Sequence, residues 1–258
     1  MSFTGKSPSE TYKDILNIDN SNSGVDSTAR DVKTADGSSS AMSLSDRSLI
    51  VKSNTNNANA LHVKNSSGDA KFQVDTTNNQ VKALGTHINT QYQKFGLTGF
   101  MSSGATSGQH LLLHPDGVVD DGLALSALNM GTGTDPATSL TLSNNAHTYL
   151  KLFWYIHDNI SIDAVHSLEA ADAATGDTTR FHLYEYDYTD GSASVLTNGS
   201  LVAHSADQVN AGYEQMYYNT WTIDSASISS GKVILCTFES DTVNSDYWAQ
   251  VTVKYHLT

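Results

Sequence analysis

The stretch GDAKFQVDTTNNQVKALG, from Gly68 to Gly85, contains two short runs of alternating apolar and polar residues around a polar turn. Alternation with a period of two is typical of a β-strand with one apolar face, and an Asn-rich segment such as DTTNNQ is typical of a tight turn. Each run offers two apolar side chains: Phe72 and Val74 in the first, Val81 and Ala83 in the second. Strands with so few apolar residues cannot form a core within one chain.

The same pattern recurs through residues 44–91, where pairs of apolar residues two apart are separated by polar turns. We expect three identical chains to wind around a common axis, because each pair then meets its symmetry mates in a thin central core. The predicted trimer core consists of Leu49, Val51, Leu61, Val63, Phe72, Val74 and Val81. The alternative is a monomeric β-meander that lies on the C-terminal domain.

The N-terminal segment SPSETYKDILNI carries the signals of a helix start, with Ser7 as the N-cap, Pro8 at the first helical position and Glu10 completing a capping box. Tyr12, Ile15 and Leu16 then form a narrow apolar stripe. A helix of about ten residues is marginal alone in water, so we expect it to dock on a partner or on the rest of the chain. The polar stretch from Asp19 to Ser43 predicts an extended arm that orders against a partner; a disordered linker is the alternative.

Composition and charge exclude several classes of protein. Only 16% of the residues are charged, and Ser, Thr, Asn and Gly carry the polar load, which is typical of β-rich proteins. Residues 1–99 hold 10 basic and 9 acidic side chains, whereas residues 100–258 hold 4 basic and 18 acidic ones. This acidic half argues against nucleic-acid binding, which needs clustered Lys and Arg. The one cysteine, Cys236, is predicted to be a buried thiol, and no apolar run predicts membrane insertion.

Residues 100–258 hold all three tryptophans and 17 of the 22 aromatic residues. Seven or eight strand-like runs follow one another between turn clusters, and the last, YWAQVTVKYHL, alternates clearly between two faces. These features predict an all-β chain that ends in an antiparallel, jelly-roll-like β-sandwich. The predicted domains are an anchor helix and arm (1–43), a trimerising β-shaft (44–99) and a jelly-roll-like head (100–258).

The segments GKSPSETYKDIL (Gly5 to Leu16) and ALHVKNSSGDAKFQVDTTNNQVKALGT (Ala60 to Thr86) carry a resemblance to a known family. In their order along the chain they resemble the N-terminal and β-shaft segments of fibre-type virion proteins of marine tailed bacteriophages. The resemblance covers about the first 90 residues and implies a homotrimeric virion appendage that is made in the host bacterial cytoplasm. A tail fibre is favoured, and a head fibre or fibre adaptor stays open. It also implies that Pro8, Tyr12, Ile15 and Leu16 attach the fibre to another virion protein.

The stretch RFHLYEYDY, from Arg180 to Tyr188, places Tyr184, Tyr186 and Tyr188 on one strand face. A row of tyrosines can stack on sugar rings, so these three are candidate contacts to a host cell-surface glycan or protein receptor. The alternative is that they pack inside the sandwich or at a trimer interface. A receptor-binding protein acting through the head is therefore the second candidate function.

Catalytic and metal-binding signals are weak. The histidines of HLLLH (His110 and His114) are too far apart on a strand to share an ion, and we expect them on the outer face of an edge strand. A calcium ion near Asp116, Asp120 and Asp121 stays open, but we predict no cofactor and no metal. Glu185 and Asp187 suit a polysaccharide depolymerase, yet no catalytic fingerprint accompanies them, so we predict that the protein is not an enzyme.

Overall fold

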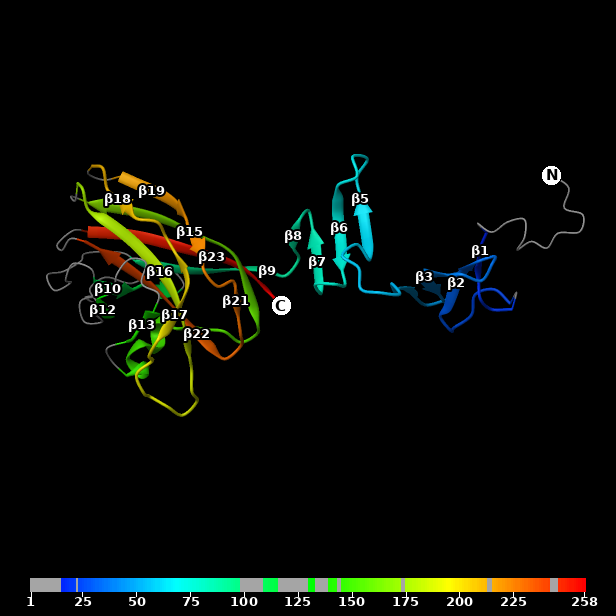
Figure 1. Cartoon of the computed structure of the whole chain (residues 1–258), viewed down its shortest axis with the longest axis horizontal. Coiled ribbons are helices and arrows are strands. Elements are labelled where there is room, and N and C mark those ends of the chain that lie inside the picture. Colours follow the sequence, from blue (N-terminus) through cyan, green and yellow to red (C-terminus); the bar gives the residue numbers. More distant parts are fainter. Residues whose placement is uncertain are drawn as a thin grey trace, which may run out of the picture. The chain divides into compact units, whose positions relative to one another are not determined.

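The computed structural model describes residues 15–21, 23–97, 109–115, 130–132, 139–142, 145–172, 175–212, 215–241 and 246–258. Contacts divide the chain into two compact units, residues 1–88 and 89–258. The all-β prediction is confirmed, since the described elements are antiparallel strands and one short 3-10 helix, η2 (Ala146–Leu152) (Figure 1). None of the helices within these ranges is long and apolar enough to cross a membrane.

The first unit contains two four-stranded antiparallel sheets, each a meander in which consecutive strands are neighbours. The first sheet consists of β1 (Leu16–Ile18), β2 (Arg30–Thr34), β3 (Ser39–Leu44) and β4 (Leu49–Val51). The second consists of β5 (Leu61–Lys64), β6 (Ala70–Asp75), β7 (Gln80–Ala83) and β8 (Thr86–His87). The short strands and polar turns expected of residues 44–91 are thus present.

The predictions for the N-terminal segment differ from the structure. Pro8 and Tyr12 lie outside the described residues, but Leu16 begins strand β1 instead of ending a helix, because it pairs with Thr34. The prediction of an extended arm is also wrong, since β2 and β3 form a sheet there. Strand β2 is held by backbone pairing with β1 and β3 and by the burial of Val32. The few apolar residues of this stretch do not reveal that pairing in the sequence. Strand β4 belongs to this same sheet, on the other side of the predicted boundary at residue 43.

The second unit consists of two antiparallel sheets. The strand order in one is β12-β10-β22-β16-β17-β13, with β14, β18 and β20 at its sides; in the other it is β11-β9-β23-β15-β19, with β21 beside β15. The first sheet's strands are β10 (Gln109–Leu112), β12 (Met130–Thr132), β13 (Ser139–Leu140), β14 (Trp154–Tyr155), β16 (Thr178–Asp187), β17 (Gly199–His204), β18 (Gln208–Val209), β20 (Thr222–Ile223) and β22 (Lys232–Ser240). The second sheet's are β9 (Thr90–Leu97), β11 (His114–Pro115), β15 (Ile160–Asp172), β19 (Gln215–Thr220), β21 (Ser227–Ile228) and β23 (Asp246–Leu257).

The two sheets form a β-sandwich whose main strands alternate between sheets in the manner of a jelly roll, as predicted. The buried core between them includes Phe95, Phe181, Phe238, Val251 and Val253. The alternation predicted for the last strand is confirmed, since Val251 and Val253 are buried whereas Trp248 is 41% exposed. Strand β9 pairs with β23, so this unit begins at Asn89, eleven residues before residue 100, where the sequence predicts the start of the head.

A second core covers the other face of the β10–β22–β16 sheet. Helix η2 contributes Tyr149 and Leu152, which pack with Leu112, Tyr184 and Leu235. Gly199 makes room for this packing, because a Cβ atom at that position would lie 2.2 Å from the Tyr186 ring. Both faces of this sheet are therefore buried over much of its length, and Cys236 lies within it as the buried thiol that the sequence predicts.

Candidate functional site

The sheet β5–β8 carries an apolar face that this chain leaves partly uncovered. Leu61 lies opposite Val74, which lies opposite Val81; in the neighbouring row Val63 lies opposite Phe72, which lies opposite Ala83. Directly opposed residues of antiparallel strands point to the same side of a sheet, so all six side chains share one face. Leu61 is 40% exposed and Val63 is 55% exposed, so this face is available to a partner.

The opposite face of the same sheet is polar. His62 lies opposite Gln73, which lies opposite Lys82, which in turn lies opposite His87. The sheet is thus amphipathic across its thickness, with one face suited to water and one suited to a partner.

The turn between β6 and β7 sets this register. The Asp75 carboxylate accepts hydrogen bonds from the backbone N–H groups of Thr77 and Asn78, at 2.9 and 3.0 Å, and from the Asn78 side chain at 2.8 Å. These bonds, led by the one from the Asn78 side chain, lower the pKa of Asp75. A slip by one residue would move every apolar side chain to the other face, so the Asp75 turn preserves the uncovered apolar face.

The sheet β1–β4 has a similar face. Ile18 lies opposite Val32, Leu44 opposite Leu49, and Met42 opposite Val51. Leu49 is 61% exposed and Val51 is 39% exposed, whereas Val32 is buried. The seven residues predicted to form a trimer core therefore lie on two separate sheets, and on each sheet they share one face.

The outer face of the β9–β23–β15–β19 sheet carries a further exposed apolar patch. Register places Ala170 between Trp248 and Met216 in one row, and Leu168 between Gln250 and Tyr218 in the next. The exposed fractions are 76% for Met216, 62% for Tyr218, 46% for Leu168 and 41% for Trp248. Large apolar side chains gathered on neighbouring strands indicate a protein interaction surface.

The predicted receptor contacts Tyr184 and Tyr186 are buried and belong to the second core of the head, so they are not available to a receptor. The alternation that puts them on one face is present, but η2 and its neighbours cover that face, which sequence periodicity does not reveal. Burial raises the pKa of the Tyr186 hydroxyl far above its ordinary value. Tyr188 lies just beyond the end of β16 and is 38% exposed.

Tyr188 lines an open hollow of about 290 Å³ in the head. The hollow is rich in hydroxyl and amide groups and includes one carboxylate. Its polar lining comes from Asp187, Tyr188, Thr189, Ser192, Ser194, Thr197 and Asn198. Tyr188 also meets the ring of Tyr155 edge-on at 5.8 Å, and Tyr155 lines a second hollow of about 190 Å³ together with Trp154 and Asp158. An exposed aromatic pair beside a polar hollow suits sugar rings.

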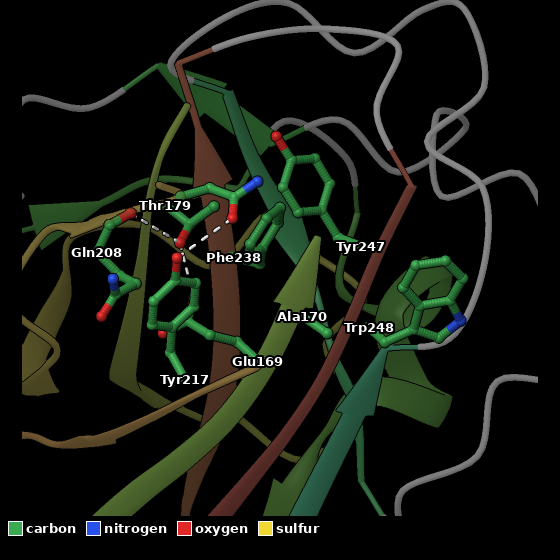
Figure 2. A pocket seen from close by; sticks show the side chains of 9 residues that line it. Glu169, Ala170, Thr179, Gln208, Tyr217, Phe238, Tyr247 and Trp248 are labelled. Atoms are coloured by element: carbon green, nitrogen blue, oxygen red, sulfur yellow. Dashed lines mark hydrogen bonds between the residues drawn. The ribbon is translucent and has the colours of Figure 1, made fainter. Parts of the chain in front are cut away.

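A buried carboxyl group lies between the two sheets of the head. Thr179 donates a hydrogen bond to Glu169 at 2.7 Å (Figure 2). Asn219 donates a second one. Burial is the main cause that raises the pKa of Glu169, as it would for a general acid. The space beside it is only about 10 Å³, which holds about one water molecule and no sugar. This group is therefore part of the internal packing of the head.

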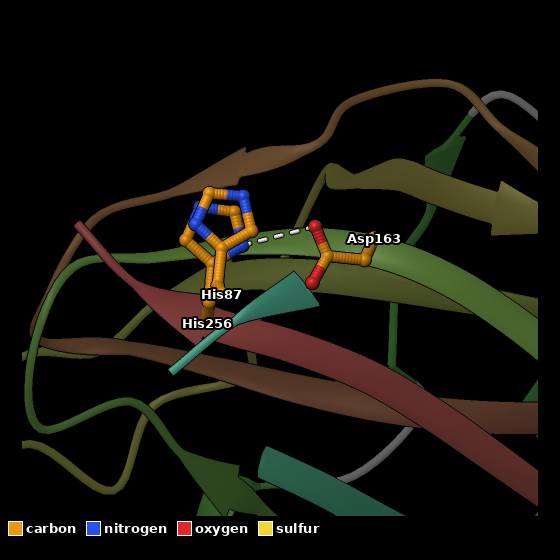
Figure 3. Close-up of side chains that lie close together, drawn as sticks. All are labelled: His87, Asp163 and His256. Atoms are coloured by element: carbon orange, nitrogen blue, oxygen red, sulfur yellow. Dashed lines mark hydrogen bonds and ion pairs between the residues drawn. The ribbon is translucent and has the colours of Figure 1, made fainter. Parts of the chain in front are cut away.

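Asp163 and His256 form a second polar pair in the head, and Asp163 lies at a β-bulge. The pairing of β15 with β23 shifts between Ile162 and Ala164, so Asp163 is the extra residue on β15. Its carboxylate lies 2.9 Å from Nδ1 of His256, which is largely buried (Figure 3). The pair links two central strands of one sheet.

Other residues considered from sequence have mixed outcomes. Asp116, Asp120 and Asp121, the candidate calcium ligands, lie outside the described residues. The prediction that His110 lies on the outer face of an edge strand is wrong, because β10 pairs with both β12 and β22 and His110 is fully buried. HLLLH instead crosses between the sheets, with His110 in β10 and His114 in β11. Asp187 is exposed and forms an ion pair with Lys232 at 2.5 Å.

Comparisons with known proteins add little. No protein-family model matches the chain, and no curated protein matches it. Among solved structures, the Eiger TNF of S. frugiperda is similar with a TM-score of 0.31 and 10% sequence identity, over 66% of this chain and 94% of that one. A likeness of this degree supports no inference, so the assignment of the head as a jelly roll relies on its strand order.

The raised pKa of Glu169 predicts a pH-dependent effect of replacing it. Folding favours the protonated carboxyl, so its contribution to stability is greatest at low pH and is lost as the pH rises through the folded pKa. The variant Glu169→Gln keeps a neutral hydrogen-bonding group. Its melting temperature relative to wild type is therefore expected to be higher at pH 7 than at pH 4, as measured by circular dichroism. The control Glu185→Gln makes the same change of charge on strand β16 and corrects for the altered net charge of the protein. If the difference in melting temperature between Glu169→Gln and wild type did not vary with pH, the raised pKa of Glu169 would be contradicted.

Proposed function

We propose that the protein is a non-enzymatic structural component of a phage virion, a short homotrimeric fibre with an outward jelly-roll head. A tail fibre is the form we favour, with a head fibre or fibre adaptor as variants of the same role. The observation that carries the proposal is the apolar face of β5–β8, which cross-strand register assembles and which this chain leaves partly exposed. The occupant we infer for this face is the same face of two further copies.

The energy available from such an assembly is substantial. Full burial of a Val or Leu side chain is worth about 1.5–3 kcal/mol. Because Leu61 and Val63 are roughly half exposed, covering these two alone contributes a similar amount in each chain. Three copies also suit a face only two rows wide, because three narrow faces can close around one axis. The exposed patch at Leu168, Met216 and Tyr218 offers the head a self-contact of its own.

Charge on the apolar face is expected to abolish the trimer. In Val63→Asp, each copy would bring a carboxylate into the thin core, where three like charges are desolvated together. We expect light scattering to change from three times the chain mass of 27.7 kDa to a single chain mass, with at least about a hundredfold weaker association. The matched control is His62→Asp, which places the same charge on the polar face of the same strand. Trimers in both variants would contradict the assignment of this face.

The anchoring role belongs to the residues before β1 together with its first residues. Ile15 and Leu16 are 47% and 55% exposed, so they are available to another virion protein. Removal of residues 1–14 leaves every described strand intact. We expect the truncated protein to stay trimeric but to be missing from purified particles, as judged by mass spectrometry of the virion. Incorporation at the normal copy number would refute the anchoring role of this segment.

A second candidate function is host attachment through the head. The hollow beside Tyr188 is the candidate receptor site, because Tyr184 and Tyr186 are buried. The lining of hydroxyl groups, one carboxylate and an exposed ring is the chemistry that recognises a glycan. On a glycan array we expect binding that falls at least about tenfold in Tyr188→Ala. The control Tyr92→Ala removes a more exposed ring from strand β9 and is expected to bind normally. Equal binding by both variants would exclude this hollow as the receptor site.

A further inference from the structure

A cluster of two histidines and one glutamate lies inside the head, and its members come from three neighbouring strands. The register places His110 of β10 opposite Glu239 of β22, since Leu111 pairs with Phe238 and Leu112 with Thr237. On the other side, Glu239 pairs with Arg180 and Thr237 with His182 of β16. His110, His182 and Glu239 therefore share one face of the sheet, although up to 129 positions separate them in the sequence.

The three side chains are close enough to share one ion. One ligand atom from each lies within 4.8 Å of the other two. Nε2 of His110 lies 3.9 Å from a carboxylate oxygen of Glu239, and the rings of His110 and His182 have centroids 5.0 Å apart. The ligand atoms of a tetrahedral zinc ion lie roughly 3.4 Å apart, given metal–ligand bonds of about 2.0–2.2 Å. Small side-chain rotations would therefore bring the three atoms into range.

The environment prepares these groups for a metal. His110, His182 and Glu239 are at most 2% exposed. Nε2 of His110 makes no hydrogen bond to any residue that the structure describes, whereas its other nitrogen, Nδ1, lies 3.2 Å from the Thr237 hydroxyl.

Neighbouring side chains orient the candidate ligands. The Thr237 hydroxyl at Nδ1 of His110 leaves Nε2 facing Glu239, which is the arrangement typical of metal-bound histidines. The Arg180 guanidinium lies 3.5 Å from the other carboxylate oxygen of Glu239 and holds the carboxylate in place. Asp207 draws the same guanidinium toward itself, at 3.1 and 3.3 Å, and so partly offsets its positive charge beside the cluster.

We propose that His110, His182 and Glu239 bind one divalent transition-metal ion, with Zn²⁺ as the best-suited ion, and that this ion ties β10, β22 and β16 together. Two imidazoles and one carboxylate form a ligand set suited to zinc, with a fourth position for water. The ion would act as a structural cross-link in a chain whose single cysteine excludes an internal disulfide.

Metal titration of the full chain tests the proposal. Protein without a histidine tag is first dialysed against EDTA and then titrated with ZnCl₂ by calorimetry and with CoCl₂ by visible absorption. We expect one ion per chain and the ligand-field bands of four-coordinate Co²⁺. At zinc a hundredfold above the dissociation constant, the melting temperature is expected to rise by roughly 5–10 °C.

The variants His110→Gln and His182→Gln are expected to bind at least about a hundredfold more weakly and to lose the cobalt bands. The control His166→Gln removes a histidine on the outer face of the other sheet and is expected to bind as wild type does. Since a variant could fail to fold, near-ultraviolet circular dichroism of each metal-free variant is compared with that of metal-free wild type. Absence of stoichiometric binding by wild type, or equal binding by all three variants, would overturn the proposal.

Discussion

The cross-strand register of β5, β6 and β7 is the constraint on which the account of this protein depends. It places six apolar side chains on one face of a small sheet, and the Asp75 turn prevents the slip that would scatter them. A four-stranded sheet with one apolar face becomes stable when that face is covered. The polar row of His62, Gln73 and Lys82 on the opposite side leaves only one face for a partner. The local geometry of a hairpin thus supports the proposal that further copies of the chain cover this face.

The charge distribution is compatible with the proposed association of three copies through an apolar contact. Residues 1–99 carry 10 basic and 9 acidic side chains, so three copies repel one another little there. The remaining residues carry 18 acidic and 4 basic side chains, and three such heads repel. Any attraction between heads therefore has to come from uncharged surface, such as the patch that contains Leu168, Met216 and Tyr218. The same repulsion implies that added salt strengthens association of the heads.

Much of the fold could be predicted from local sequence patterns. Period-2 alternation identified the shaft strands, and alternation in the last strand identified Val251 and Val253 as core residues. Periodicity gives the two faces of a strand but not what covers them, so Tyr184 and Tyr186 could not be recognised as buried under η2. The sheet at β1–β4 was missed because its pairing relies on the backbone and on few apolar residues. His110, His182 and Glu239 were missed as a group because only the register of three distant strands unites them.

The most direct test of the account is the mass of the untruncated chain in solution, measured by sedimentation equilibrium across a dilution series at pH 7. The uncovered face of β5–β8 predicts a mass three times the 27.7 kDa of one chain, maintained to low micromolar concentration. A mass of one or two chains under the same conditions would contradict the central claim.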